Sequence, residues 1–215
     1  MHQCLGLILE PSQKIKEVLA PYLRNDENPN GFMDYYYIGN KWAGTIHLKP
    51  GGTAILPGKK ISELIVSESQ MLEVMLGGYI MNGVAGYADI AKVKDIDFGP
   101  KPSTVEAYGP VWETLVNGSP PSPKMQDEVP WLHRDEETAQ RLIEIFGDKE
   151  RFLAVQSCYP FESVLTPDGK FHPQDVERFT CQGLRLCYAE SGLFHERMKE
   201  YLLPENILAV IDYHL

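Results

Sequence analysis

The residues best suited to acid–base chemistry lie near the two ends of this sequence. Asp212 and His214 are two positions apart in an apolar segment, so in a strand both side chains point to one face. A carboxylate that orients a histidine is a recurring general-base arrangement. Asp34, just before a run of tyrosines, is the third candidate. We therefore take Asp34, Asp212 and His214 as candidate catalytic residues. The alternative is that Asp212 and His214 are exposed polar residues at a strand end.

The aromatic stretch from Phe32 to Leu48 supplies most of the candidate binding residues. The run 35–38 favours a strand, because bulky and branched side chains fit a pleated surface, and it places Tyr35 and Tyr37 on one face. Gly39 and Asn40 tolerate a left-handed backbone and so indicate a tight corner. Residues 45–48 then read as a returning strand.

Two interpretations of this stretch stay open. In one it is a packed hairpin whose tryptophan fills the core. In the other it is a rim on which Asp34, the tyrosines and Trp42 line a pocket, since aromatic residues with polar tips favour such edges. The candidate binding residues are Tyr35, Tyr37, Trp42 and, just after a predicted turn, His172.

Several familiar motifs are missing. Gly39 and Gly44 have the spacing of a phosphate-binding loop, but the lysine that must follow the second glycine is missing. The sequence contains neither a nucleophile elbow nor a His-Glu-x-x-His helix. A metal site built from Cys158, His172, Cys181 and Cys187 is conceivable, but free and mostly buried thiols are the preferred interpretation of the cysteines, which include Cys4. We predict no metal and no cofactor.

Composition narrows the class of protein. The chain has 215 residues and a formal net charge of −10, which argues against a general nucleic-acid binder, because phosphate binding depends on clustered Lys and Arg. The apolar run at residues 4–9 is too short for the core of a signal peptide, and no window has the length of a membrane span. A cytoplasmic, soluble protein is the expectation.

The pattern of elements predicts an α+β fold. Pro167 and Gly169 mark a tight turn, and Asp135 and Gly147 are the start and stop signals of a helix. The other expected strands are at 5–9, 152–158 and 207–213. The expected helices are one from Ser12 that Pro21 ends or kinks near Ala20, one from Ser67 to Gly77, and one through Phe194, Met198, Tyr201 and Leu202. This succession predicts a mixed sheet with helices on one face and ferredoxin-like elements.

The expected organisation is a single domain over residues 1–215. A proline-rich excursion at about 100–130 interrupts it, and residues 117–130 are the best place for a boundary if two domains exist.

Three segments carry a resemblance to known proteins. The segments 34–44, 166–172 and 209–214 resemble a group of uncharacterised phage- and prophage-type proteins, in which the first motif looks like Asp-x-Tyr-x-Ile-Gly-Gly-Arg-Trp-x-Gly and the last like a strand ending Val-Asp-x-His. This chain has Asn40 and Lys41 where the group has Gly and Arg. Lys41 would poorly replace an arginine that made a bidentate contact. The resemblance implies a phage or mobile-element setting and no known activity.

Three classes of function follow. The first is a phage accessory or interaction protein of no assigned activity, whose aromatic corner contacts an unknown protein partner or small ligand. The second is a small hydrolase, possibly metal-dependent, that uses the three candidate catalytic residues. The third, ranked last, is an acidic DNA mimic, because the acidic residues here are accompanied by lysines and arginines. The sequence gives no oligomeric state.

Overall fold

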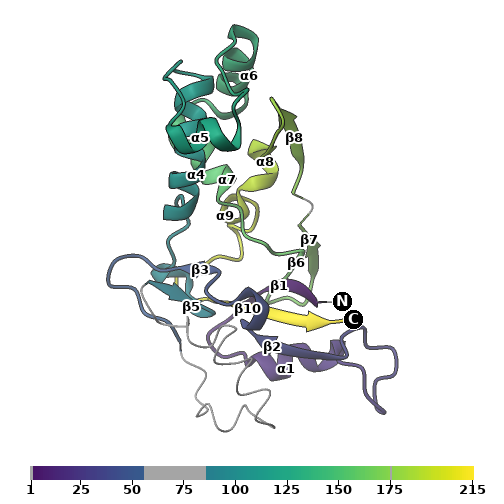
Figure 1. The fold of residues 1–215 in the computed structure, drawn as a ribbon. Coiled ribbons are helices and arrows are strands. Elements are labelled where there is room, and N and C mark those ends of the chain that lie inside the picture. Colours follow the sequence, from purple (N-terminus) through teal and green to yellow (C-terminus); the bar gives the residue numbers. More distant parts are fainter. Residues whose placement is uncertain (1, 56–85, 175) are drawn as a thin grey trace. The chain divides into compact units, whose positions relative to one another are not determined.

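The chain forms two compact units in the computed structural model, which describes residues 2–55, 86–174 and 176–215 (Figure 1). The sheet unit comprises Met1–Asp97, Pro160–Gln174 and Met198–Leu215, and the helical unit comprises Phe98–Tyr159 and Asp175–Arg197. The chain therefore leaves the sheet unit and returns to it twice. The single domain over residues 1–215 stays a prediction.

The sheet unit is built on a six-stranded mixed sheet, which confirms the predicted α+β class. Its strands are β1 (His2–Leu9), β2 (Tyr35–Ile38), β5 (Ile90–Lys92), β6 (Ser163–Leu165), β7 (Phe171–Pro173) and β10 (Ile207–His214). The order is β2-β10-β1-β6-β7, and β5 pairs with the first half of β10. β1 and β6 are parallel, and the other pairs are antiparallel.

The longest strands, β1 and β10, pair along their whole length from His2↔His214 to Leu9↔Ile207. This register brings the labelled N and C ends side by side (Figure 1). β10 also pairs with β2 on its other side, so the tyrosine strand and the C-terminal strand share one sheet. Since β10 is central, its polar residues are not at a solvated edge.

One face of this sheet packs against a short helical segment. Helix α1 (Ile15–Leu19) continues into the 3-10 turn η1 (Ala20–Tyr22). Pro21 has no backbone N–H to donate inside an α-helix, but it fits the first turn of a new helical segment. Every second residue of each strand faces this core. The core residues on the strands include Leu5, Leu7, Leu165, Ala209 and Ile211, all fully buried.

The opposite face carries the even-numbered residues of β1 and β10. Its middle is apolar, with Ile8, Leu208 and Val210 fully buried. Gly6 is needed there, because a Cβ at this position would lie 2.9 Å from the ring of Phe161. Toward the chain ends this face turns polar, at His2, Asp212 and His214.

The predicted turn after β6 is confirmed. Gly169 has a φ of +79°, and its N–H donates to the carbonyl of Thr166 at 2.9 Å. The hydroxyl of Thr166 also donates to the carboxylate of Asp168 at 2.5 Å, so the turn from β6 into β7 is fixed locally.

The interpretation of the aromatic stretch as a hairpin is wrong. After β2 the chain makes the 3-10 turn η2 (Asn40–Trp42), and the next strand, β3 (Ile46–His47), pairs with β4 (Tyr87–Ala88). The left-handed backbone at Gly39 (φ +72°) and Asn40 (φ +47°) turns the chain out of the sheet, and β10 becomes the partner of β2 instead. Another 3-10 turn, η3 (Val93–Asp95), follows β5.

The helical unit combines helices with one hairpin around its own core. Its elements are α4 (Pro102–Leu115), α5 (Pro123–Glu128), α6 (Glu136–Phe146), α7 (Lys149–Gln156), α8 (Ala189–Gly192), α9 (Phe194–Arg197), β8 (Arg178–Cys181) and β9 (Leu184–Cys187). The side chain of Asp135 accepts the N–H of Thr138 at 2.8 Å, and Gly147 ends α6 with a φ of +79°. The predicted start and end of this helix are confirmed.

The expected strand at 152–158 and the expected length of the last helix are wrong. The segment 152–158 is mostly helical, because Asp148 caps α7 by accepting the N–H of Arg151, and an apolar run of this length fits a buried helix as well as a strand. The proline-rich region contains α4 and α5, each with a proline in its first turn, where the missing N–H costs nothing. The last helix is a single turn, α9, rather than a segment reaching Leu202.

The helix expected from Ser67 to Gly77 lies outside the described residues. None of the helices in the described part of the chain combines the length and the apolar character that a membrane crossing needs.

Candidate functional site

The polar end of the sheet gathers residues from three strands. Antiparallel pairing sets His2 of β1 beside His214 of β10, and Asp212 of β10 beside Tyr37 of β2. Cross-strand partners point to the same face, so all four side chains share it. The register, and not proximity in sequence, therefore assembles this site.

Asp212 is the buried centre of the arrangement, with no exposed surface. Its Oδ1 lies 3.0 Å from Nδ1 of His2, and its Oδ2 accepts from the side-chain amide of Asn40 at 2.6 Å and from the N–H of Lys41 at 3.4 Å. In the tautomer that carries its proton on Nδ1, His2 donates to this carboxylate and its Nε2 can accept a proton. The alternative in which Asp212 is an exposed strand-end residue is wrong.

A second carboxylate contacts the second histidine. Oδ2 of Asp34 lies 3.4 Å from Nδ1 of His214, and the N–H of Asp34 donates to the carbonyl of His214 at 2.8 Å. Oδ1 of Asp34 accepts from the guanidinium of Arg24 at 3.2 Å. The main chain and the side chain of Asp34 are thus both tied to the end of β10.

The two imidazoles stand side by side. Their ring centroids are 5.5 Å apart at an interplanar angle of 76°. The side chains of His2 and His214 keep 39% and 32% of their surface exposed, whereas Asp212 beneath them has none. We call His2, Asp34, Asp212 and His214 the histidine cluster: two accessible imidazoles, each contacted at Nδ1 by a carboxylate.

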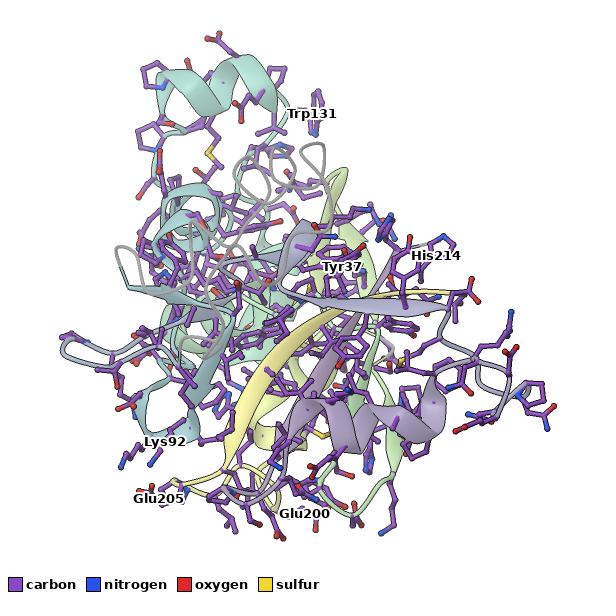
Figure 2. All side chains as sticks on the ribbon, turned by 90° about the horizontal axis from the view of Figure 1, so that it is seen from below. Tyr37, Lys92, Trp131, Glu200, Glu205 and His214 are labelled. Atoms are coloured by element: carbon purple, nitrogen blue, oxygen red, sulfur yellow. The ribbon has the colours of Figure 1, made fainter. Side chains whose placement is uncertain are left out.

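Two tyrosines flank the histidine cluster. The ring of Tyr35 stacks on His214 at 5.1 Å with an interplanar angle of 6°, and Tyr37 meets Tyr35 edge-to-face at 5.5 Å. Figure 2 shows Tyr37 on β2 and His214 near the end of β10. Tyr35 and Tyr37 are 41% and 37% exposed, so an aromatic surface borders the imidazoles.

A second buried acid, Asp89, supports the corner that follows β2. Its Oδ1 accepts the N–H of Gly44 at 2.7 Å, and a Cβ on Gly39 would lie 2.5 Å from its carboxyl carbon. Burial raises the pKa of Asp89 to about 6, and the hydrogen bond from Gly44 opposes that rise. Asp212 and Asp89 therefore hold the corner 39–44 from two sides.

The other two predicted binding residues, Trp42 and His172, lie elsewhere in the sheet unit. Trp42 lies in η2, where the ammonium of Lys41 is 5.2 Å from its ring, and its buried Nε1 has no hydrogen-bond partner among the described residues. His172 lies on β7, at the other end of the strand order from β2, with its ring 5.5 Å from Tyr201.

Sequence reasoning missed His2, Asn40 as a hydrogen-bond donor, and Asp89. His2 lies 210 positions from its carboxylate partner Asp212, and only the β1–β10 register brings the two together. The start of β1 does not alternate, because His2 and Gln3 are both polar, so no local pattern indicated His2.

Among the described residues, no group of three His, Cys, Asp or Glu side chains is placed to hold a metal ion. No protein-family model, curated protein or solved structure matches this chain. The function must therefore be argued from the site itself.

Proposed function

We propose that the protein is a small hydrolase in which the two histidines act as a general base and a general acid. The observation that supports this proposal is the pair of carboxylate–imidazole contacts, His2–Asp212 at 3.0 Å and His214–Asp34 at 3.4 Å, on neighbouring strands. Two adjacent groups that can each carry or release a proton suit a reaction in which one proton is removed while another is delivered.

The buried partner distinguishes the two roles. Asp212 is fixed by Asn40 and by the N–H of Lys41, so it holds His2 in the tautomer whose Nε2 accepts. His2 then takes a proton from a water molecule, whose oxygen attacks the acyl or phosphoryl centre of an ester. His214, as the imidazolium, gives its proton to the departing oxygen. Return of one proton from His2 to His214 through water restores both groups.

The surroundings indicate the substrate class. Tyr35 and Tyr37 offer aromatic surface beside His214, which suits an ester with an aromatic or apolar group. The net charge of −10 disfavours a long polyanion such as nucleic acid. A small ester or phosphoester is the ligand class that we expect.

The test is hydrolysis of para-nitrophenyl butyrate and bis(para-nitrophenyl) phosphate by the whole protein. His2→Ala and His214→Ala are each expected to lower kcat/KM about 100- to 10,000-fold. The matched control is His133→Ala, an exposed histidine of the helical unit whose ring contacts the carbonyl of Trp131.

The pH–rate profile separates the two roles. A wild-type profile with two limbs is expected, because the base must be unprotonated and the acid protonated. His2→Ala should lose the acidic limb and His214→Ala the alkaline limb. Absence of hydrolysis of either substrate, or equal rates in all three variants, would reject the proposal.

A second candidate is the role of a phage or mobile-element accessory protein in the cytoplasm, which binds a partner through β2. Tyr35 and Tyr37 are exposed there, and within the described residues β2 ends the strand order of the sheet. A strand in that place can pair with an extended peptide while its tyrosines supply contact area.

Selection from a yeast-displayed library of random peptides tests this candidate. The expected peptides bind wild type at least about tenfold more tightly than the variant with both Tyr35→Ala and Tyr37→Ala, a loss of about 1.4 kcal/mol. Peptides that bind both proteins equally would argue against a role for β2. The peptide selection and the hydrolysis assay are independent, so either candidate function can be rejected without affecting the other.

A further inference from the structure

The helical unit brings two cysteines into sulfur contact. Sγ of Cys158, two residues after α7, lies 3.5 Å from Sγ of Cys187, the last residue of β9. Both cysteines are free thiols in the structure. A disulfide needs the sulfurs at about 2.0 Å, so the side chains must close a gap of only about 1.5 Å to form one. We call Cys158 and Cys187 the thiol pair.

A buried side chain fixes the backbone on one side of the thiol pair. Oε1 of Gln156 accepts the N–H of Cys187 at 2.8 Å, and its Nε2 donates to the carbonyl of Cys187 at 3.1 Å. Gln156 is itself the last residue of α7 and is 9% exposed. These two bonds tie the end of β9 to the end of α7, so the sulfur contact follows from the main-chain geometry.

Two basic residues, Arg178 and Lys101, act on the thiol pair. Antiparallel pairing sets Arg178 of β8 directly opposite Cys187. The hydrogen bond from the Cys187 thiol, followed by the charges of Arg178 and Lys101, lowers the pKa of Cys158 to about 6, although burial opposes this. The same contact and burial raise the pKa of Cys187. The two thiols therefore differ in acidity.

The two thiols also differ in solvent exposure. Cys158 is partly exposed, whereas Cys187 is 6% exposed and packs in the apolar core of the helical unit with residues such as Leu186 and Phe152. The more acidic thiol, Cys158, is thus the one that a reagent can reach. The buried thiol, Cys187, lies in contact with Cys158. This division suits an attacking and a resolving cysteine.

We propose that Cys158 and Cys187 form a thiol–disulfide exchange centre that reacts with low-molecular-weight disulfides. This activity lies in the helical unit and is independent of the proposed hydrolase. Its assignment rests on the sulfur contact, the Gln156 bonds and the placement of Arg178.

The reaction balances as a two-electron exchange. The thiolate of Cys158 attacks one sulfur of the disulfide RS–SR, which forms a mixed disulfide and releases one RS⁻. Cys187 then loses its proton to solvent, and its sulfur attacks Sγ of Cys158 and releases the second RS⁻. The two released thiolates take up protons to give 2 RSH, so the small disulfide is reduced and the pair is oxidised to a Cys158–Cys187 disulfide.

Peptide mapping of the whole protein tests the product. The protein is equilibrated with mixtures of oxidised and reduced glutathione and then unfolded in guanidinium chloride with N-ethylmaleimide, which blocks its free thiols. Its peptides are identified by mass spectrometry. The expected result is one internal link, between Cys158 and Cys187, with Cys4 and Cys181 alkylated. In urea that preference should vanish, because the chain no longer holds the sulfurs together.

Single variants test the order of attack. Cys187→Ser should accumulate glutathione on Cys158, Cys158→Ser should leave Cys187 unmodified, and the control Cys181→Ser should oxidise like wild type. Cys181 is a fair control, because it lies in the same hairpin and burial raises its pKa. Glutathione that stays on Cys158 in the wild-type protein, or links spread over all four cysteines before urea is added, would overturn the proposal.

The alkylation rates of the cysteines in the wild-type protein test the role of Cys158 without any variant. At about pH 7 iodoacetamide should modify Cys158 roughly 3- to 6-fold faster than Cys181, because its larger thiolate fraction outweighs the lower nucleophilicity of an acidic thiol. A slower reaction of Cys158 than of Cys181 would contradict its role as the attacking group.

Discussion

The histidine cluster of the sheet unit and the thiol pair of the helical unit are assembled in opposite ways. Strand register brings His2 and His214 together, and their rings remain accessible over a buried Asp212. The thiol pair instead depends on one side chain, Gln156, which binds the backbone of Cys187 inside an apolar core. The stability of the fold should therefore depend little on the side chains of a site that strand register assembles. It should depend strongly on the side chain of a site that one buried contact holds together. The predictions below test this difference.

The largest effect is expected where the backbone of the register-built site is disturbed. Gly39→Ala puts a Cβ 2.5 Å from the carboxyl carbon of Asp89 at a φ of +72°, so strain and overpacking add to about 2–5 kcal/mol of lost stability. Urea denaturation measures it. Gly51→Ala is the matched control: Gly51 has a φ of +79° but nothing within 4 Å of the added Cβ, so it should lose only about 1 kcal/mol. Equal losses in the two variants would contradict the close packing of Asp89.

A pH series should reveal the buried acid behind this corner. The pKa of Asp89 is raised from 3.8 to about 6, so the folded state favours the protonated form. Stability from this group is therefore fully present below about pH 4 and falls as the pH rises through about 6. Between about pH 4 and pH 7 the wild type should lose about 2–3 kcal/mol relative to Asp89→Asn. A difference that stays constant with pH would show that Asp89 does not titrate in this range.

For the thiol pair the expected pH trend has the opposite sign. The pKa of Cys158 is lowered from 9.0 to about 6, so its stabilising effect is present above about pH 9 and is lost as the pH falls through about 6. We expect hydrogen exchange of α7, corrected for intrinsic rates, to slow as the pH rises between these limits. Cys158→Ser should abolish that trend. A trend that persists in this variant would have to come from another group.

Removal of the Gln156 side chain tests the helical unit directly. Gln156→Ala leaves the N–H and the carbonyl of Cys187 without their partner in a buried place, at a cost of about 2 kcal/mol. It should also reduce the yield of the Cys158–Cys187 link under glutathione. Gln140→Ala is the control, because Gln140 is exposed and bonds Glu144 within α6. Denaturant unfolding and peptide mapping supply the two readouts.

The smallest effect is expected for a histidine of the cluster. His214→Ala removes a partly exposed contact with Asp34, which is worth less than about 1 kcal/mol and is weakened further by salt. Thermal unfolding at low and high salt checks it. A loss of stability as large as that of Gln156→Ala would mean that the histidine cluster stabilises the fold as strongly as the Gln156 contact does, which would contradict the difference between the two sites.

The parts of the fold that depend on short-range signals were predictable. Asp135 and Gly147 bound a helix because a cap and a left-handed glycine act within one turn, and the turn at Gly169 follows from the same kind of local chemistry. Phe152 and its neighbours could not be assigned in this way, because an apolar run suits a buried helix or strand equally. Helix α4 was hidden by its prolines, including Pro110 within it.

The candidate site was only partly predictable for a similar reason. Asp34 and His214 are in contact, and alternation along β10 places Asp212 on the same face as His214, where its carboxylate contacts His2. His2 and Asp89 could not be found, because their partners lie 210 and 45 positions away in the sequence. Burial of Asp212 also depends on the register of strands that pair across the whole chain.

The position of β10 has a consequence for how the protein is made. β10 has an interior place in its sheet, between β1 on one side and β2 and β5 on the other, yet it is translated after all three of these partners. Until residue 214 has emerged, β1 and β2 lack the strand that joins them, because each pairs with a segment translated more than 170 residues later. Nascent chains that stall before β10 should therefore depend on chaperones.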